Sequence, residues 1–187
     1  MTDRFKLLTT EIAGLYVAER QPVADERGML ERIFCEEELQ DFFQDKSIVQ
    51  INRTLTARQG SVRGLHFQYP PYVEAKSVRC LHGEIYDVAV DLRRDSPTFL
   101  EHHAEILSGD NHRSMLIPAG FAHGFQALSD DAELLYLHTA AWHRDAEGGL
   151  NANDTRLGIP WPLPVSGLSE RDAAHPLLDE DFTGVVL

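Results

Sequence analysis

Short β-prone segments separated by turn residues run through most of this chain. In EIYDVAVDL, residues 84–92, Tyr86, Val88 and Val90 alternate with acidic and small residues, which is the period of two that a strand produces. Polar turns such as SGDN, residues 108–111, punctuate these segments. Many short, evenly spaced strands are typical of a β-sandwich or β-barrel. The predicted strands are residues 48–56, 77–92, 100–107, 113–117, 123–129 and 133–140.

Turns and helices are expected at a few places only. His82-Gly83 interrupts residues 77–92 and predicts a hairpin turn there. Residues 36–45, EEELQDFFQD, carry apolar side chains on one side of a predicted helix. Beyond residue 150 the chain becomes loop-like, and residues 169–182 are expected to form a short helix or two.

The bulk properties describe an ordinary globular chain. Its 187 residues suit one domain with a sizeable core, so residues 1–187 are predicted to form a single domain. No apolar run approaches the ~20 residues of a membrane helix. The N-terminal residues lack the apolar stretch of a signal peptide, which predicts a cytoplasmic protein. Cys35 and Cys80 share no metal-type spacing and are expected to be free.

Charge restricts the partners that the chain could bind. A net charge of −13 argues against binding nucleic acid through a basic surface. It still permits an anionic small molecule, because a few arginines in a cleft can hold a diphosphate locally.

The densest cluster of reactive side chains lies in residues 61–80. On a regular strand Arg63 and Leu65 would face one way and His66 the other. Gly64, two residues before His66, is expected to leave room for a ligand against the strand. Histidine suits proton abstraction near neutral pH, but taken alone His66 could equally be a core or surface histidine.

Three further residues are candidates, each with a structural alternative. His123 follows a Pro-Gly turn in IPAGFAHGF and could simply be hydrogen-bonded within that turn. Tyr136 shares a strand face with His138, where an aromatic core residue is the commoner outcome. Asp172 ends an S-x-x-D pattern and could cap a C-terminal helix.

Metal and cofactor signatures are weak. The chain has nine histidines, but only His102 and His103 are adjacent and no H-x-H pair occurs, so three ligands are hard to assemble. The phosphate-binding patterns GxGxxG and GxxxxGK[ST] and the hydrolase pattern GxSxG are absent. No metal site and no cofactor are predicted.

Taken together, seven segments resemble the dTDP-4-dehydrorhamnose 3,5-epimerase family. They run in order over nearly the whole chain, which makes the resemblance far more specific than any one motif. The resemblance implies a mainly β, cupin-type jelly-roll β-barrel with a few short helices, mostly at the C-terminus. It also implies a metal-free homodimer that binds a small-molecule nucleotide sugar. The segments are DERG (25–28), VRGLHFQ (62–68), PPY…K…VRC (70–80), YDVAVDLRRDSPTF (86–99), IPAGFAHGF (117–125), LGIPWP (157–162) and LSERDAAHPLL (168–178).

The same resemblance implies a role for individual residues. His66 matches the general base, and Asp172 matches the carboxylate that orients it. Tyr136 matches the proposed acid on the opposite face of the sugar, and Lys76 matches a lysine near the C4 oxygen. The matching ligand-binding positions are Arg27 and Arg63 for the diphosphate, with Gln50, Asn52, His123, Glu147 and Arg171 elsewhere in the site.

These residue types suit proton transfer beside a ketone. A hydrogen next to a carbonyl is acidic because the anion that remains spreads onto the oxygen. A histidine held by an aspartate supplies the base. A lysine ammonium stabilises the enolate, and a phenol on the other face can return the proton. Both C3 and C5 adjoin the C4 ketone, so one site can treat both carbons. The resemblance implies 3,5-epimerisation, with dTDP-4-keto-6-deoxyglucose as the expected substrate.

The chain departs from the family near the nucleotide base. A gapless comparison puts Leu30 where the family has an aromatic residue and Arg32 where it has a glutamate. Trp142 stands where the family often has a second tyrosine, and it could still stack on a base.

Those departures leave alternatives open. The enzyme could be a 3-epimerase only, or could use a GDP- or CDP-linked keto sugar. A sugar-nucleotide-binding cupin without activity and a metal-dependent cupin oxygenase or isomerase are alternatives of other classes.

Overall fold

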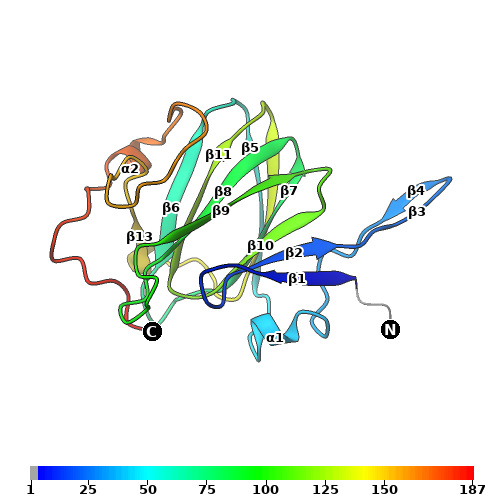
Figure 1. The fold of residues 1–187 in the computed structure, drawn as a ribbon, viewed down its shortest axis with the longest axis horizontal. Helices are drawn as coiled ribbons and strands as arrows, with labels where there is room; N and C mark the ends of the chain where they lie inside the picture. The colour runs from blue at the N-terminus through cyan, green and yellow to red at the C-terminus, as the bar shows by residue number, and fades with distance from the viewer. Residues whose placement is uncertain (1–3) are drawn as a thin grey trace.

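Two antiparallel sheets face each other in the computed structural model, which describes residues 4–187 (Figure 1). The first sheet has the strand order β1 (Phe5–Thr9), β2 (Tyr16–Arg20), β10 (Arg113–Ile117), β7 (Lys76–His82), β12 (Ala132–His138) and β5 (Gln50–Thr56). The second has the order β13 (Glu147–Gly149), β6 (Val62–Gln68), β11 (Phe121–Ala127), β8 (Glu84–Asp91) and β9 (His102–Ser108).

The prediction of a mainly β jelly roll is confirmed. No strand pairing joins the two sheets within residues 4–187, so they form an open sandwich and not a closed barrel. A separate hairpin, β3 (Val23–Asp25) and β4 (Gly28–Leu30), projects away from both sheets (Figure 1). The helical elements are short: α1 (Gln40–Phe43), α2 (Glu170–Ala173) and a 3-10 turn (Arg144–Ala146).

The main core lies between the two sheets. Ile85, Leu107, Ile117, Phe125 and Leu134 are almost completely buried in one cluster. Burying one such side chain contributes about 1.5–3 kcal/mol, so this cluster holds the sheets together. The alternation of apolar and polar residues in the sequence predicted these strands because one face of each is buried.

The hairpin predicted at His82-Gly83 is wrong. β7 pairs with β10 and β12, whereas β8 pairs with β11 and β9, so the turn carries the chain from one sheet to the other. Gly83 has φ +75°, which suits a sharp reversal in either arrangement. Turn residues therefore located the reversal but could not say which strands pair.

The helix predicted over residues 36–45 is mostly a set of turns. Only α1 is helical, although Leu39 and Phe43 are buried as its apolar side predicted. They pack on the outer face of the first sheet against Ala18 and Leu116. A helix this short depends on such packing and not on its own propensity.

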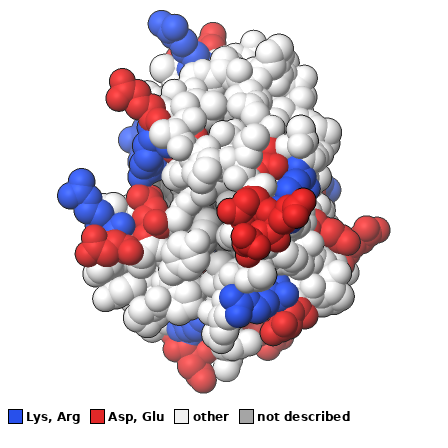
Figure 2. Space-filling model, turned by 90° about the vertical axis from the view of Figure 1, so that its left-hand side faces the viewer, with Lys and Arg blue, Asp and Glu red and all other residues white. Residues whose placement is uncertain are grey.

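The C-terminal segment covers the outer face of the second sheet (Figure 1). Leu157 and Val185 from this segment pack on Val88 and Val90 of β8. On the face shown in Figure 2, acidic and basic side chains occur in small mixed groups among neutral residues. None of the helices in the described part of the chain is long and apolar enough to cross a membrane.

Candidate active site

A cavity of about 550 Å³ lies between the two sheets, and side chains of both sheets line it. Its size falls within the range of small-molecule sites, and its lining is rich in polar groups. Ten of the residues predicted for the site line it: Gln50, Asn52, Arg63, His66, Lys76, His123, Tyr136, Trp142, Glu147 and Arg171.

Strand register builds the wall that the first sheet contributes. His138 of β12 lies opposite Lys76 of β7 and Gln50 of β5, which gives one row of side chains. Tyr136 lies opposite Asn52 in the next row. Because alternate residues of a strand face the same side, these rows all project into the cavity.

A bulge in β6 builds the opposite wall. His123 pairs with His66 and Phe125 pairs with Arg63, so three steps along β6 match two along β11. The extra residue shifts the alternation of β6 and brings Arg63 and His66 to the same cavity. The prediction that these two side chains face opposite ways is therefore wrong.

The bulge in β6 requires Gly64. The prediction that Gly64 leaves room for a ligand is wrong. It has φ +124°, and a Cβ atom there would lie 2.5 Å from the Cα of Gly124 and 2.8 Å from the carbonyl oxygen of His123. The space beside Gly64 is thus filled by the neighbouring strand.

Gly64→Ala should lower the free energy of unfolding by at least about 2 kcal/mol, because it adds a backbone clash to an unfavourable φ. Urea unfolding measures this loss. Gly28→Ala is the matched control, since Gly28 has φ +127° but no atom within 4 Å of its Cβ position. Equal losses in both variants would contradict the role given to the close approach of β11.

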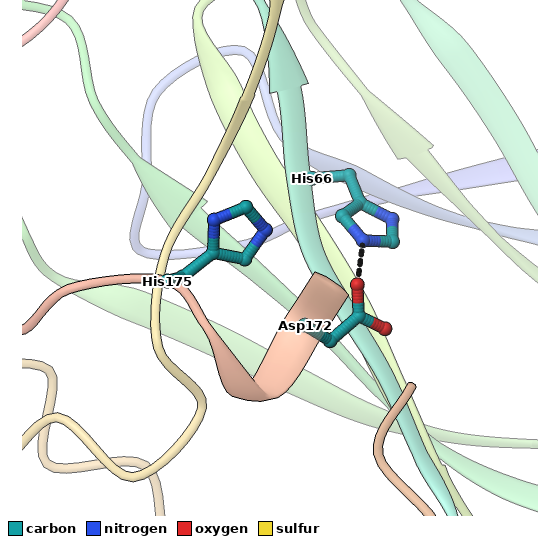
Figure 3. A group of neighbouring side chains, drawn as sticks. All are labelled: His66, Asp172 and His175. Carbon is teal, nitrogen blue, oxygen red and sulfur yellow. Dashed lines mark hydrogen bonds and ion pairs between the residues drawn. The ribbon is translucent and has the colours of Figure 1, made fainter. Parts of the chain in front are cut away.

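His66 and Asp172 meet in space. The Nε2 atom of His66 lies 2.7 Å from Oδ1 of Asp172, and the other ring nitrogen points away from the carboxylate (Figure 3). The His66 side chain is 30% exposed, whereas that of Asp172 is 5% exposed. The histidine is therefore accessible from the cavity, while its partner is shielded from water.

Asp172 is held as a carboxylate. Burial acts to raise the pKa of Asp172, but the hydrogen bond and charge of His66 outweigh burial and lower it to about 2. An ionised carboxylate only accepts hydrogen bonds, so Nε2 of His66 donates its proton and Nδ1 keeps a free lone pair.

The carboxylate of Asp172 does not cap helix α2, because Ser169 does so. The Oγ atom of Ser169 accepts a hydrogen bond from the backbone N–H of Asp172 at 3.0 Å. The carboxylate of Asp172 is therefore left free to bind His66. The predicted helix start at Ser169 is confirmed, but the cap is the serine and not the aspartate.

Arg171 and Glu147 lie beside this pair. An Nη1 of Arg171 donates to Oε2 of Glu147 at 2.8 Å, and its Nη2 lies 3.1 Å from Nε2 of His66. Because Arg171 is half-exposed at the cavity, it offers a cation to an incoming anionic ligand.

Two further groups complete the walls. Burial raises the pKa of Tyr136 far above its usual value, so the phenol keeps its proton. His123 is hydrogen-bonded from Nε2 to Oδ1 of the fully buried Asp87 at 2.7 Å. Its ring meets that of Tyr136 edge-on, with the centroids 6.0 Å apart.

Among residues 4–187, one group of side chains could offer three ligands to a metal: His66, Asp172 and His175, whose ligand atoms lie within 4.8 Å of one another (Figure 3). The sequence predicted no such group, because His66 is distant in the chain from the other two residues and only the fold brings them together. The guanidinium of Arg171 is 3.1 Å from the His66 nitrogen, and its positive charge opposes a metal cation there.

One predicted residue lies elsewhere. Arg27 is at the turn of the β3–β4 hairpin, where its side chain is 85% exposed and pairs with Asp25 at 2.5 Å. Other lining residues were not predicted. Thr54 and His138 follow Asn52 and Tyr136 by two positions, so strand period could have found them. Glu74 lies in the loop before β7, where no pattern pointed to it.

Residues 9–180 match the family model described as dTDP-4-dehydrorhamnose 3,5-epimerase. The chain belongs to this family. Its members are named as epimerases, so the chain falls in a family of isomerases.

Individual members of the epimerase family resemble the chain over most of its length. A dTDP-4-dehydrorhamnose 3,5-epimerase of Pseudomonas aeruginosa is 44% identical, over 86% of this chain and 89% of the relative. A crystal structure of the Legionella pneumophila dTDP-6-deoxy-D-glucose-3,5-epimerase, in complex with dTDP-4-keto-L-rhamnose, matches with a TM-score of 0.90 and 36% identity. That match covers 98% of this chain and 99% of the other. A 3'-monoepimerase of Streptomyces bikiniensis, in complex with dTDP-quinovose, has a TM-score of 0.83 at 31% identity, covering 90% and 85% of the two chains.

Proposed function

We propose that this chain epimerises a nucleotide-linked 4-keto-6-deoxy sugar at the carbons beside the ketone, with dTDP-4-keto-6-deoxyglucose as substrate. The observation that carries the proposal is the 2.7 Å contact between His66 and Asp172 at a cavity that also holds Lys76 and Tyr136. Binding alone needs no such base with an orienting carboxylate, which argues against an inactive sugar-binding protein.

The reaction proceeds in two proton transfers. Nδ1 of His66 takes the hydrogen from C3 or C5, and the electron pair of the C–H bond moves onto the C4 oxygen as an enolate. Lys76 stabilises that oxygen by its positive charge. Tyr136 then donates its proton to the carbon from the opposite face. His66 releases the proton that it took to solvent, and solvent reprotonates the phenolate. The sugar loses one proton and gains another that comes from solvent, so its formula and oxidation state are unchanged.

The names of the relatives support a dTDP sugar. The Pseudomonas, Legionella and Streptomyces proteins are named for a dTDP sugar or were crystallised in complex with one. Initial rates with the dTDP-, GDP- and CDP-linked forms of the same keto sugar test this choice. The dTDP form should react at least about 10-fold faster in kcat/KM, as expected for loss of about 1.4 kcal/mol of base contacts. Equal rates with all three would contradict it.

The likeness to a 3'-monoepimerase supports a second candidate activity, in which only C3 is inverted. Both activities use the same base, and they differ in whether the C5 hydrogen also reaches it. The stereochemistry of the product at C5 separates them: inversion at both carbons supports the 3,5-epimerase.

We also propose that the protein works as a homodimer in which the β3–β4 hairpin reaches the partner. This hairpin projects from the fold and exposes Met29 and Leu30. Val49, just before β5, and Ile51 within β5 are exposed as well. Such apolar surface is typical of an interface. In such a dimer Arg27, which is exposed in the single chain, would bind the diphosphate of the substrate in the partner's cavity.

Mixing two variants tests this arrangement. Arg27→Ala should raise KM about 10-fold or more by removing a charged contact to the diphosphate, and His66→Asn should be inactive. Unfolded and refolded together in equal amounts and assayed at substrate well below KM, they should recover about a quarter of wild-type activity. Half the dimers are then mixed and each has one intact site, while the Arg27→Ala dimers contribute little at this substrate level.

The control is the same two variants mixed without unfolding, where subunits stay paired as before. Recovery in neither mixture, or a monomer in size-exclusion chromatography with light scattering, would contradict the shared site.

A further inference from the structure

A second histidine–carboxylate pair lies in the same cavity, on the wall that faces His66. Oε2 of Glu74 is 2.8 Å from Nδ1 of His138, and Oε1 of Glu74 is 2.8 Å from Nζ of Lys76. Both oxygens of one carboxylate are therefore engaged. The side chains of all three residues are 10% exposed or less.

Glu74 is the counter-ion of a buried ammonium. Burial acts to raise the pKa of Glu74, but the charge of Lys76 and the hydrogen bond of His138 outweigh burial and lower it to about 2. An ammonium and a carboxylate withdrawn from water tolerate burial when they pair with each other. Removing the negative charge would leave Lys76 buried without a partner.

His138 fixes the carboxylate in turn. One ring nitrogen binds Glu74, and the other lies 3.4 Å from the side-chain amide of Asn52 on β5. The ring also stacks on Tyr136, with the centroids 5.9 Å apart and the planes at 14°. Because Asn52 and Tyr136 hold its imidazole, His138 keeps the Glu74 carboxylate in one orientation. The carboxylate in turn fixes the position of the Lys76 ammonium.

We propose that Glu74 is a positioning residue of this site, that it holds the Lys76 ammonium at the point where the substrate's C4 oxygen binds, and that His138 acts through Glu74. The proposal rests on the function proposed above, which places Lys76 at the enolate oxygen. A donor that is already fixed costs little reorganisation when charge develops, and a displacement of about 1 Å can cost up to about 100-fold in rate.

Glu74→Gln tests the proposal with almost no change of shape. It should lower kcat by about 10- to 100-fold and change KM by less than about threefold, because Lys76 acts on charge that exists only in the transition state. Glu74→Asp, which keeps the charge but shortens the reach, should fall between Glu74→Gln and wild type. Glu133→Gln is the matched control, since Glu133 pairs with the exposed Arg53 outside the cavity. It should remain within about twofold of wild type.

A double-mutant cycle tests the part assigned to His138. His138→Gln alone should lower kcat about three- to tenfold, and it should have no further effect in the Glu74→Gln background. Multiplicative losses, or wild-type kcat in Glu74→Gln, would overturn the proposal. So would a Glu74→Gln variant that unfolds or loses activity through KM, because Glu74 would then be structural. A wild-type protein without epimerase activity would instead overturn the proposed function.

Discussion

His66→Asn should slow epimerisation by at least about 1,000-fold, since asparagine cannot take a proton and a positioned general base contributes about 10²- to 10⁴-fold. The side chain of His66 is only partly buried and makes one hydrogen bond to Asp172, so the fold should survive its replacement. Conversion of dTDP-4-keto-6-deoxyglucose, followed by NMR, measures the loss.

The affinity for dTDP is the control for this variant. If His66 serves only the proton transfer, the dissociation constant for dTDP should stay within about threefold of wild type, a difference of less than about 0.7 kcal/mol. A variant that retains a tenth of the wild-type rate would exclude His66 as the base.

Asp172→Asn is expected to lower kcat by about 10²- to 10⁴-fold while leaving the fold in place. The amide occupies the space of the carboxylate but can donate to the His66 nitrogen, which then carries its proton on the reactive side. The cap at Ser169 uses the backbone N–H of residue 172 and is therefore kept. The pH profile of kcat measures the loss of activity, and circular dichroism shows whether the fold is kept. An unchanged kcat would contradict the role of Asp172.

The same variant predicts an altered acid stability. The pKa of Asp172 is lowered from 3.8 to about 2 in the fold, so its ionised form stabilises the protein above about pH 4. That contribution, about 2 kcal/mol, is lost as the pH falls from about 4 to about 2. Asp172→Asn should lack this loss, and urea unfolding at pH 6 and pH 3 compares the two proteins.

Local sequence patterns predicted most strands in the middle of the chain, missed β1 to β4 and β13, and predicted the partners of the strands poorly. Residues 113–117 were predicted as a strand and form β10 with the same bounds. Burial of one face leaves a period of two in the sequence, whereas the choice of neighbouring strand leaves none. The reversal at His82-Gly83 shows this, because identical turn residues can end a hairpin or cross between sheets.

The same contrast holds for the candidate site: local motifs identified single residues, but not the contacts between them. Tyr136 and His123 could be named from motifs, but the meeting of His66 with Asp172 depends on contacts between residues far apart in the chain. The bulge that turns Arg63 toward His66 arises from the pairing of β6 with β11, which no local pattern records. Glu74 gave no signal because loop residues have no period.

Deuterium wash-in tests the central claim most directly, namely that His66 removes a proton from a carbon next to the ketone. Wild-type protein in heavy water should place deuterium at C3 and C5 of dTDP-4-keto-6-deoxyglucose, as resolved by NMR, whereas His66→Asn should place none at either carbon. Equal deuterium incorporation by the two proteins, or none by the wild type, would contradict the account.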